Sequence, residues 1–396
     1  MKHFRTWAVT GLALALLLAA CGSSSSSSAS GKGKTLKLGG LFSLTGAGAV
    51  YGPQQKNAVE LAQDTINAAG GVNGAQLQIT VVDDGSAQTQ AAQQMQTLIQ
   101  EDGVLGVLGP TLSNSAVSAD PVADNLKTPV VAVSNTGFDI VGSCPYPCTY
   151  IFRDSLGEAS AVPANIHTYV DRVTPKPTTG VLLYPNDDKF SIDGATVVKQ
   201  TVGSVGINLV DTIQFSKNDT DLSPFVSQAV SHHPDVIFIT SLGAIPSKVM
   251  TLARQDGFTG QFLGGNGFNS AAVSAQAGAA GKGAQSASAW YLNNTFPSNA
   301  SFVSAYKAKF GTDPDQFAAQ AYAGVLIFAD AAKRAHLTYT NTAADRQAID
   351  NALPATNIQT PLGPFQFTAQ HDVRQTIWVI SMDGKGGFNL VKSVSP

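Results

Sequence analysis

Apolar positions along the first part of the chain change period in a regular way. The short apolar runs 36–42 and 77–82 have the length of strands. Between them, apolar residues recur at helical spacing from Ala58 to Ala69, and the pair Gly70-Gly71 then ends the helix without a Cβ penalty. The pattern predicts a strand, a helix and a second strand, which is a βαβ unit.

The same alternation continues through most of the chain. A helical stretch at 88–101 precedes the apolar run 104–109, which is typical of a strand buried on both faces. A second set of predicted strands lies at 180–184, 209–213 and 236–240, with helical segments between them. A chain of 396 residues exceeds one typical core, so we expect an α/β protein with two doubly wound parallel-sheet lobes.

The beginning of the chain is typical of a bacterial lipoprotein signal. A positively charged start precedes the apolar run 8–18, which ends in small residues before Cys21 and is too short for a comfortable membrane span. We therefore predict a signal over 1–21 with lipid on Cys21. The Ser/Gly-rich segment 22–34 predicts a flexible tether, so that the folded part begins near Thr35 on the extracytoplasmic face of the membrane.

The other two of the 3 cysteines are Cys144 and Cys148. Outside the cytoplasm we expect them to form a disulfide, which acts as a local clip because its loop is short. Two cysteines alone make a poor zinc site, and no histidine stands at ligand spacing from them. We predict no metal and no cofactor.

Composition and motifs argue against two large classes of function. The formal net charge is -3, only 13% of residues are charged, and no basic stripe is present, so nucleic acid is not an expected partner. The chain has no glycine-rich phosphate loop and no Gly-x-Ser-x-Gly elbow, so we do not expect an enzyme.

The opening unit resembles the periplasmic leucine/isoleucine/valine-binding protein family, whose members are solute receptors of ABC importers. The resemblance rests on the loop 43–46, the pair Tyr51-Gly52, the run INAAGGVNG at 66–74 and the pair Asp83-Asp84, which occur in family order. It implies a type I periplasmic-binding-protein fold with three hinge crossings between the lobes.

The family's crossings imply where each lobe begins and ends. The N-terminal lobe would hold 35–154 with 288–362, and the C-terminal lobe 155–287 with 363–396. A receptor that closes freely is expected to be a monomer.

The turn after the buried strand at 104–109 carries the strongest candidate site. Ser113, Asn114 and Ser115 lie at a predicted helix N-terminus, where the dipole and unpaired N–H groups attract negative charge. The resemblance implies that Ser113 holds the carboxylate of a ligand. From the residues alone, a plain N-cap explains Ser113 equally well.

Further candidates come from the resemblance. Ser134, Asn135 and Thr136 match a second carboxylate-binding corner, although Ser134 and Asn135 are also turn formers. Tyr51 matches a tyrosine that lines the ligand, and Phe190 stands where relatives commonly carry tyrosine.

Asn266 is the main departure from the family pattern. Many amino-acid binders place a carboxylate in this loop to pair the α-ammonium group, and burying that group without a charged partner costs several kcal/mol. Either another carboxylate such as Asp187 pairs the ammonium group, or the ligand lacks one, as an amide, urea or an apolar carboxylic or keto acid would. Ser241 and Trp290 are further candidates, with lobe packing as the alternative for Trp290.

These observations together predict a lipid-anchored solute-binding protein that presents a small polar ligand to an ABC permease. Branched-chain or other apolar amino acids and related carboxylates or amides are the ligand classes that remain open. A ligand-sensing receptor of the same fold, signalling to a membrane partner, is the alternative function.

Overall fold

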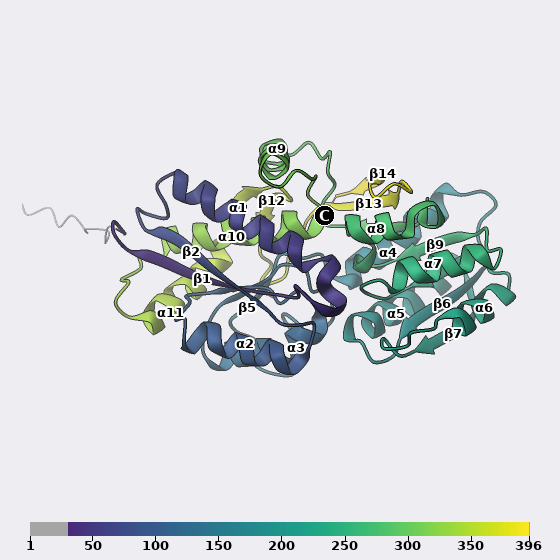
Figure 1. Cartoon of the computed structure of the whole chain (residues 1–396), viewed down its shortest axis with the longest axis horizontal. Helices are drawn as coiled ribbons and strands as arrows, with labels where there is room; N and C mark the ends of the chain where they lie inside the picture. Colours follow the sequence, from purple (N-terminus) through teal and green to yellow (C-terminus); the bar gives the residue numbers. More distant parts are fainter. Residues whose placement is uncertain (1–30, 396) are drawn as a thin grey trace, which may run out of the picture.

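The structure is a computed structural model that describes residues 31–395. The predicted lipoprotein signal, Cys21 and the first part of the tether lie outside the described residues. Two lobes lie side by side along the long axis of the molecule (Figure 1), each built around its own sheet.

The first lobe has a five-stranded parallel sheet in the order β2-β1-β3-β4-β5. Its strands are β1 (Thr35–Phe42), β2 (Gln76–Asp83), β3 (Val107–Leu108), β4 (Val130–Ala132) and β5 (Ile151–Arg153). Its helices are α1 (Gly52–Ala68), α2 (Gln88–Gln100), α3 (Ser113–Asn125), α9 (Asn299–Phe310), α10 (Gln316–Arg334) and α11 (Thr342–Ala352). Helices α1 and α10 pack together in one core, and α2 and α3 pack together in another. The sheet is thus covered on both faces, as the sequence predicts.

The second lobe has a seven-stranded sheet in the order β14-β13-β10-β9-β8-β6-β7. Its strands are β6 (Thr179–Pro185), β7 (Asn208–Phe215), β8 (Val236–Ile239), β9 (Gln261–Gly264), β10 (Gln285–Ser288), β13 (Ile377–Met382) and β14 (Phe388–Val394). Its helices are α4 (Glu158–Arg172), α5 (Lys189–Val202), α6 (Ser223–Ser231), α7 (Ile245–Gln255) and α8 (Ala271–Ala277). Strands β6 to β10 are parallel, whereas β13 pairs antiparallel with both β10 and β14, so the last two strands add an antiparallel edge.

Within residues 31–395, the chain crosses between the lobes three times, after β5, after β10 and before β13. A hairpin of β11 (Asn357–Thr360) and β12 (Gly363–Gln366) precedes the last crossing. Phe365 of this hairpin is buried in the core that contains α1 and α10. We therefore propose lobe boundaries close to the predicted ones, with the last crossing moved from Leu362 to beyond Phe367.

Two smaller features complete the description. Cys144 and Cys148 form a disulfide, which confirms that prediction. Within residues 31–395, no helix is both long enough and apolar enough to span a membrane.

Candidate functional site

A small cavity lies between the lobes, near the carboxyl ends of the strands, where parallel sheets bind ligands. It is lined by the predicted residues Tyr51, Ser113, Ser134, Asn135, Thr136, Phe190 and Asn266. The sequence analysis missed Thr111, Leu112, Leu242 and Phe317, which also line it. The free volume is only about 10 Å³, so a ligand would enter as the lobes part.

The first end of the cavity is the N-terminus of α3. The helix begins at Ser113, and its first intrahelical bond runs from the N–H of Ala116 to the carbonyl of Leu112 at 3.0 Å. The N–H groups of Ser113, Asn114 and Ser115 therefore have no intrahelical acceptor. The Ser113 hydroxyl oxygen accepts from the Gly137 N–H at 3.2 Å, which leaves the hydroxyl proton able to donate. This end offers donors suited to an anion.

The second corner is only partly available to a ligand. The Ser134 hydroxyl donates to the Thr111 carbonyl at 2.7 Å and accepts from the Gln55 amide at 2.9 Å, so it ties this loop to α1. Asn135 donates from Nδ2 to the Pro110 carbonyl at 2.8 Å, and its buried Oδ1 has no hydrogen-bond partner among the described residues. Ser134 is thus held in a structural network.

An aromatic wall joins the two lobes. The rings of Tyr51 and Phe317 lie 4.5 Å apart between centroids, and Phe190 lines the same cavity. The Tyr51 hydroxyl donates to the Gly267 carbonyl and accepts from the Gly243 N–H, both at 3.0 Å. Burial raises the pKa of Tyr51, so the hydroxyl keeps the proton that it donates. Tyr51 therefore links the first lobe to two backbone groups of the second.

The far end of the cavity is formed by Asn266, whose Nδ2 and Oδ1 atoms both have hydrogen-bond partners. Its Nδ2 donates to the Ser134 carbonyl at 3.1 Å. Its Oδ1 accepts from Gln316 at 2.5 Å and from Asn269 at 3.3 Å. Sequence reasoning missed Gln316, because no motif marks it and 50 residues separate it from Asn266.

A buried carboxylate, Glu158, lies behind this end. Its Oε1 accepts from the Thr136 hydroxyl at 3.2 Å and from the Asn266 N–H at 3.0 Å. Its Oε2 has no hydrogen-bond partner in the described part of the chain. Burial raises the pKa of Glu158 to about 7. Sequence reasoning missed this residue also, since it follows a crossing with no local signal.

Space around Glu158 is filled by close contacts. A Cβ at Gly265 would lie too close to its Oε2, so a larger residue there would require the Glu158 carboxylate to shift. Glu158 itself does not line the cavity.

Several predicted site residues lie elsewhere. Asn114 donates to Asp188 at 2.8 Å and accepts from the Lys189 N–H at 2.9 Å, so it clamps α3 to α5 across the lobes and is not directed at the cavity. Ser115 and Ser241 are buried, and neither side chain lines the small cavity that contains Ser113.

Trp290 also departs from the prediction. Its Nε1 donates to Asn299 at 2.7 Å, and its ring packs edge-on against Phe302. It belongs to the core of the first lobe, so lobe packing, the alternative reading, is what the structure shows. Asp187 is likewise engaged away from the cavity, where it accepts from the Ser216 hydroxyl and the Lys217 N–H.

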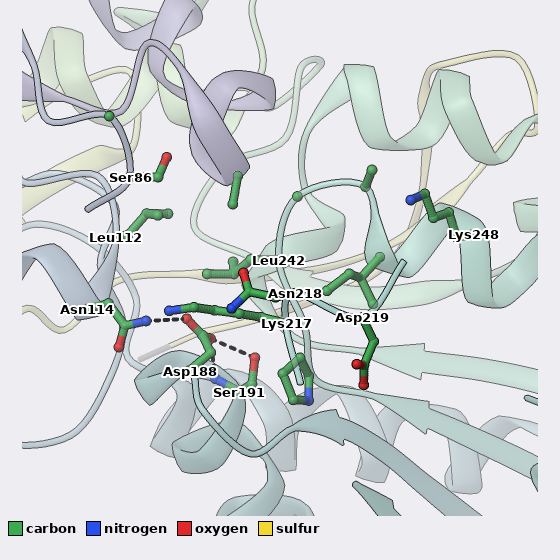
Figure 2. A pocket seen from close by; sticks show the side chains of 16 residues that line it. Ser86, Leu112, Asn114, Asp188, Ser191, Lys217, Asn218, Asp219, Leu242 and Lys248 are labelled. Carbon is green, nitrogen blue, oxygen red and sulfur yellow. Dashed lines mark hydrogen bonds between the residues drawn. The ribbon is translucent and has the colours of Figure 1, made fainter. Parts of the chain in front are cut away.

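A second, larger cavity of about 380 Å³ adjoins the first and shares Leu112 and Leu242 with it. Figure 2 shows this cavity, with the Asn114 to Asp188 hydrogen bond on one side. Lys217 lines it as well. The two leucines thus separate the small cavity from a wider part of the space between the lobes.

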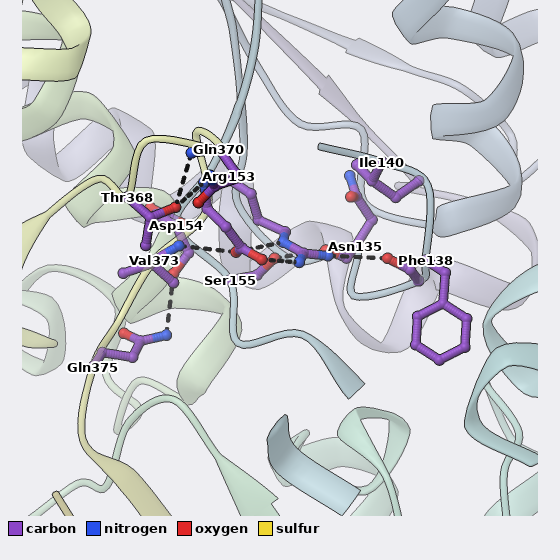
Figure 3. Close-up of polar contacts among 12 residues, drawn as sticks. Asn135, Phe138, Ile140, Arg153, Asp154, Ser155, Thr368, Gln370, Val373 and Gln375 are labelled. Atoms are coloured by element: carbon purple, nitrogen blue, oxygen red, sulfur yellow. Dashed lines mark hydrogen bonds and ion pairs between the residues drawn. The ribbon is translucent and has the colours of Figure 1, made fainter. Parts of the chain in front are cut away.

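The first and third crossings are tied together near the cavity. Arg153 donates through Nε and Nη2 to the carboxylate of Asp372, at 3.0 and 2.5 Å. Gln375 donates to the Asp154 carbonyl at 3.3 Å (Figure 3), and Ser155 donates to the Asn135 carbonyl at 2.6 Å. These bonds connect the hinge directly to the loop that carries Ser134, Asn135 and Thr136.

Comparisons with known proteins agree with this architecture. Residues 35–387 match the model of a periplasmic binding protein family. A leucine-, isoleucine-, valine-, threonine- and alanine-binding protein of Pseudomonas aeruginosa is 26% identical, over 86% of this chain and 87% of that protein.

Solved structures give the same result. The branched-chain amino acid transporter substrate-binding protein LivJ of Streptococcus pneumoniae, in complex with isoleucine, superposes with a TM-score of 0.81 at 25% identity, covering 92% of this chain and 100% of that one. A solute-binding protein of an R. palustris ABC transporter, in complex with benzoate, has a TM-score of 0.80 at 21% identity, covering 91% and 98%, which shows the shared fold.

These matches extend over most of the chain and confirm both the predicted type I fold and the predicted resemblance. Proteins of this family bind ligands and do not catalyse reactions, so the chain is a binding protein and not an enzyme. The chain belongs to the periplasmic binding protein family, in the group of the leucine/isoleucine/valine-binding proteins.

Proposed function

We propose that this protein captures a small carboxylate-bearing solute between its lobes and presents it to an ABC permease on the extracytoplasmic face of a bacterial membrane. Lipid on Cys21 would hold it there. The similarity to the P. aeruginosa and S. pneumoniae proteins supports this proposal, because the ligands that their names give are amino acids, each of which carries a carboxylate.

One observation carries the ligand part of the proposal. The N-terminus of α3 presents three N–H groups without intrahelical acceptors and the free proton of the Ser113 hydroxyl at an uncharged, largely apolar cavity. A carboxylate satisfies such donors with charge-assisted hydrogen bonds.

The contacts between the lobes describe how the ligand would be held. Tyr51, Asn114 and the Ser134 carbonyl each form hydrogen bonds with the opposite lobe. An open form would lose these bonds, and a ligand bound from both sides would favour the closed form. Binding therefore needs a hinge motion and no chemical step.

The test of this proposal is the variant Ser113→Ala in the full-length protein, after removal of any co-purified ligand. The probes are leucine and its 2-oxo analogue 4-methyl-2-oxopentanoate, titrated by calorimetry. A hydrogen bond to a charged group is worth about 1.5–3 kcal/mol, so the dissociation constant of whichever probe binds should rise by about tenfold or more.

A matched control comes from the same helix. Ser118 donates to the Gln88 and Ser115 carbonyls, away from the cavity, and Ser118→Ala should leave affinity unchanged. An unchanged affinity in Ser113→Ala would contradict the proposed carboxylate site.

The anchor and the partner need separate tests. In cells fed a labelled fatty acid, the wild-type protein should carry the label and the Cys21→Ala variant should not. The variant should also be lost from the membrane fraction. Uptake of the bound solute should depend on an ABC permease. Binding without any such uptake would favour the sensory alternative.

A further inference from the structure

We propose that the ligand is a carboxylic acid without an ammonium group, and that Gln316 sets this preference by fixing the orientation of Asn266. The inference rests on the proposed carboxylate site and names the class of ligand that the rest of the cavity accepts. Gln316 acts through Asn266, so it is a positioning residue.

The orientation of the Gln316 amide follows from its partners. Its Oε1 accepts from the Ala289 N–H at 2.8 Å, and a backbone N–H can only donate. The Ser288 hydroxyl lies 2.6 Å from both this oxygen and the Trp290 carbonyl and has one proton, so the Ala289 N–H is the group that decides the orientation. The Nε2 group must then face Asn266, to which it donates at 2.5 Å.

The orientation of Asn266 follows in turn. Since Gln316 Nε2 is a donor, the Asn266 atom that it meets must be the oxygen, Oδ1. The Nδ2 group then faces the Ser134 carbonyl, which can only accept. The Ala289 N–H can only donate and the Ser134 carbonyl can only accept. Together they exclude the alternative in which the amide groups of Gln316 and Asn266 are both rotated by 180°.

This arrangement leaves too few of the acceptors that an ammonium group would need at the far end of the cavity. The Asn266 oxygen already accepts from Gln316 and Asn269, and the Ser134 carbonyl accepts from Asn266, which leaves that carbonyl one lone pair. The buried Oδ1 of Asn135 is an acceptor without a partner among the described residues, yet it is neutral and one atom cannot satisfy three donors.

Charge leads to the same conclusion. None of the described side chains that line the cavity is charged. The Glu158 carboxylate does not line it. Its Oε1 accepts from Thr136 and Asn266, and its Oε2, which has no partner among the described residues, lies against Gly265 and not in the cavity. A desolvated ammonium group would therefore lack an anionic partner, and its burial would not be compensated.

The remaining walls suit an apolar body. Tyr51, Phe190, Phe317, Leu112 and Leu242 surround the space beyond Ser113. The class whose chemistry matches both ends and the walls, once the lobes part to admit it, is an apolar or aromatic monocarboxylate, such as a branched 2-oxo acid or an arylalkanoic acid.

The test compares matched pairs that differ at the ammonium group, using calorimetry on the full-length protein. The pairs are leucine with 4-methyl-2-oxopentanoate and phenylalanine with 3-phenylpropionate. We expect the acid in at least one pair to bind ten times or more tighter than its amino acid. Amino acids that bind as tightly as or tighter than their partners would overturn the inference while supporting the proposed carboxylate site. Failure of all four probes to bind would instead count against both the carboxylate site and the ligand class.

Two variants test the residues themselves. Asn266→Asp adds a carboxylate of the same shape at the far end, so the preference for the acid should fall at least tenfold. The control Asn208→Asp adds the same charge at an exposed position of the second lobe, at the start of β7, and should leave the preference unchanged. Gln316→Met should lower the preference for the acid, because Asn266 is freed to turn its oxygen toward a ligand, whereas a purely structural role would weaken both members of a pair equally. If Gln316→Met does not fold, the wild-type pairs and Asn266→Asp still decide the question.

Discussion

The two ends of the cavity differ in what they leave unpaired. At the α3 end, the Ser113 hydroxyl proton and the first N–H groups of the helix are free to donate. At the Asn266 end, every polar atom of the amide already has a partner. One end is prepared for a charged group and the other is sealed, so the difference indicates a ligand with a single charged end.

The largest expected effect comes from reversing the charge preference of the α3 end. Ser113→Asp places a carboxylate where the ligand's carboxylate would lie, and like charges in contact cost several kcal/mol. Binding of an acid probe should weaken by about a hundredfold or more, as measured by calorimetry. An acidic residue suits the first turn of a helix, so the variant should fold. Ser118→Asp is the control, and equal losses in both variants would contradict a specific role for Ser113.

The next effect concerns the pH dependence of closure at the sealed end. Glu158 accepts from Thr136 of the first lobe, and opening would expose it to water and return its pKa toward the ordinary value of about 4.3. In the closed form the pKa is raised to about 7, mainly by burial, while the hydrogen bonds from Asn266 and Thr136 oppose the shift. Closure therefore takes up a proton.

The sign of the effect on binding follows from this uptake. Affinity should be highest at low pH, fall by up to tenfold per unit as pH rises toward about 7, and level off above it. Dissociation constants measured from pH 5 to pH 8 test this. Glu158→Gln mimics the protonated form and should flatten the profile, so a slope that survives in this variant would exclude Glu158 as its source.

A smaller effect is expected where the lobes meet on the aromatic wall. Tyr51→Phe keeps the ring against Phe317 and removes two hydrogen bonds to the second lobe. Each is worth about 0.5–1.5 kcal/mol, so ligand affinity should fall by roughly fivefold or more through loss of the closed form. The control Tyr150→Phe removes a hydroxyl that donates to Gln347, and neither of these residues belongs to the aromatic wall. Equal affinity in wild type and Tyr51→Phe would show that this link does not stabilise closure.

The smallest effect on binding is expected at the disulfide. Cys144 and Cys148 are 4 residues apart, and closing so short a loop contributes about 2 kcal/mol in the chain-entropy model. Replacing both with serine should lower the melting temperature by a few degrees in a thermal scan and leave ligand affinity unchanged. A loss of affinity would mean that this loop supports the cavity.

Periodicity and the family resemblance predicted most of the fold. The βαβ opening, the two lobes and the buried strands β3 and β8 all follow from runs of apolar residues whose length and spacing are local properties of the chain. The antiparallel edge of the second sheet was not predicted, because strand direction depends on which strands come together in space.

The candidate site was predicted in part, and the misses have physical causes. Asn114 follows Ser113 directly, but consecutive helical side chains point about 100° apart, so one can face the cavity while the other meets Asp188. Glu158 and Gln316 act through contacts between segments far apart in the chain. Without an alignment, only the folded structure brings such residues together.

The most direct test of the central claim is a crystal structure of the protein with bound 4-methyl-2-oxopentanoate. The account predicts the ligand's carboxylate oxygens at about 2.7–3.2 Å from the Ser113 hydroxyl and the first N–H groups of α3, with Asn266 still bonded to Gln316. A carboxylate bound away from α3, or an Asn266 side chain released from Gln316 to contact the ligand, would contradict it.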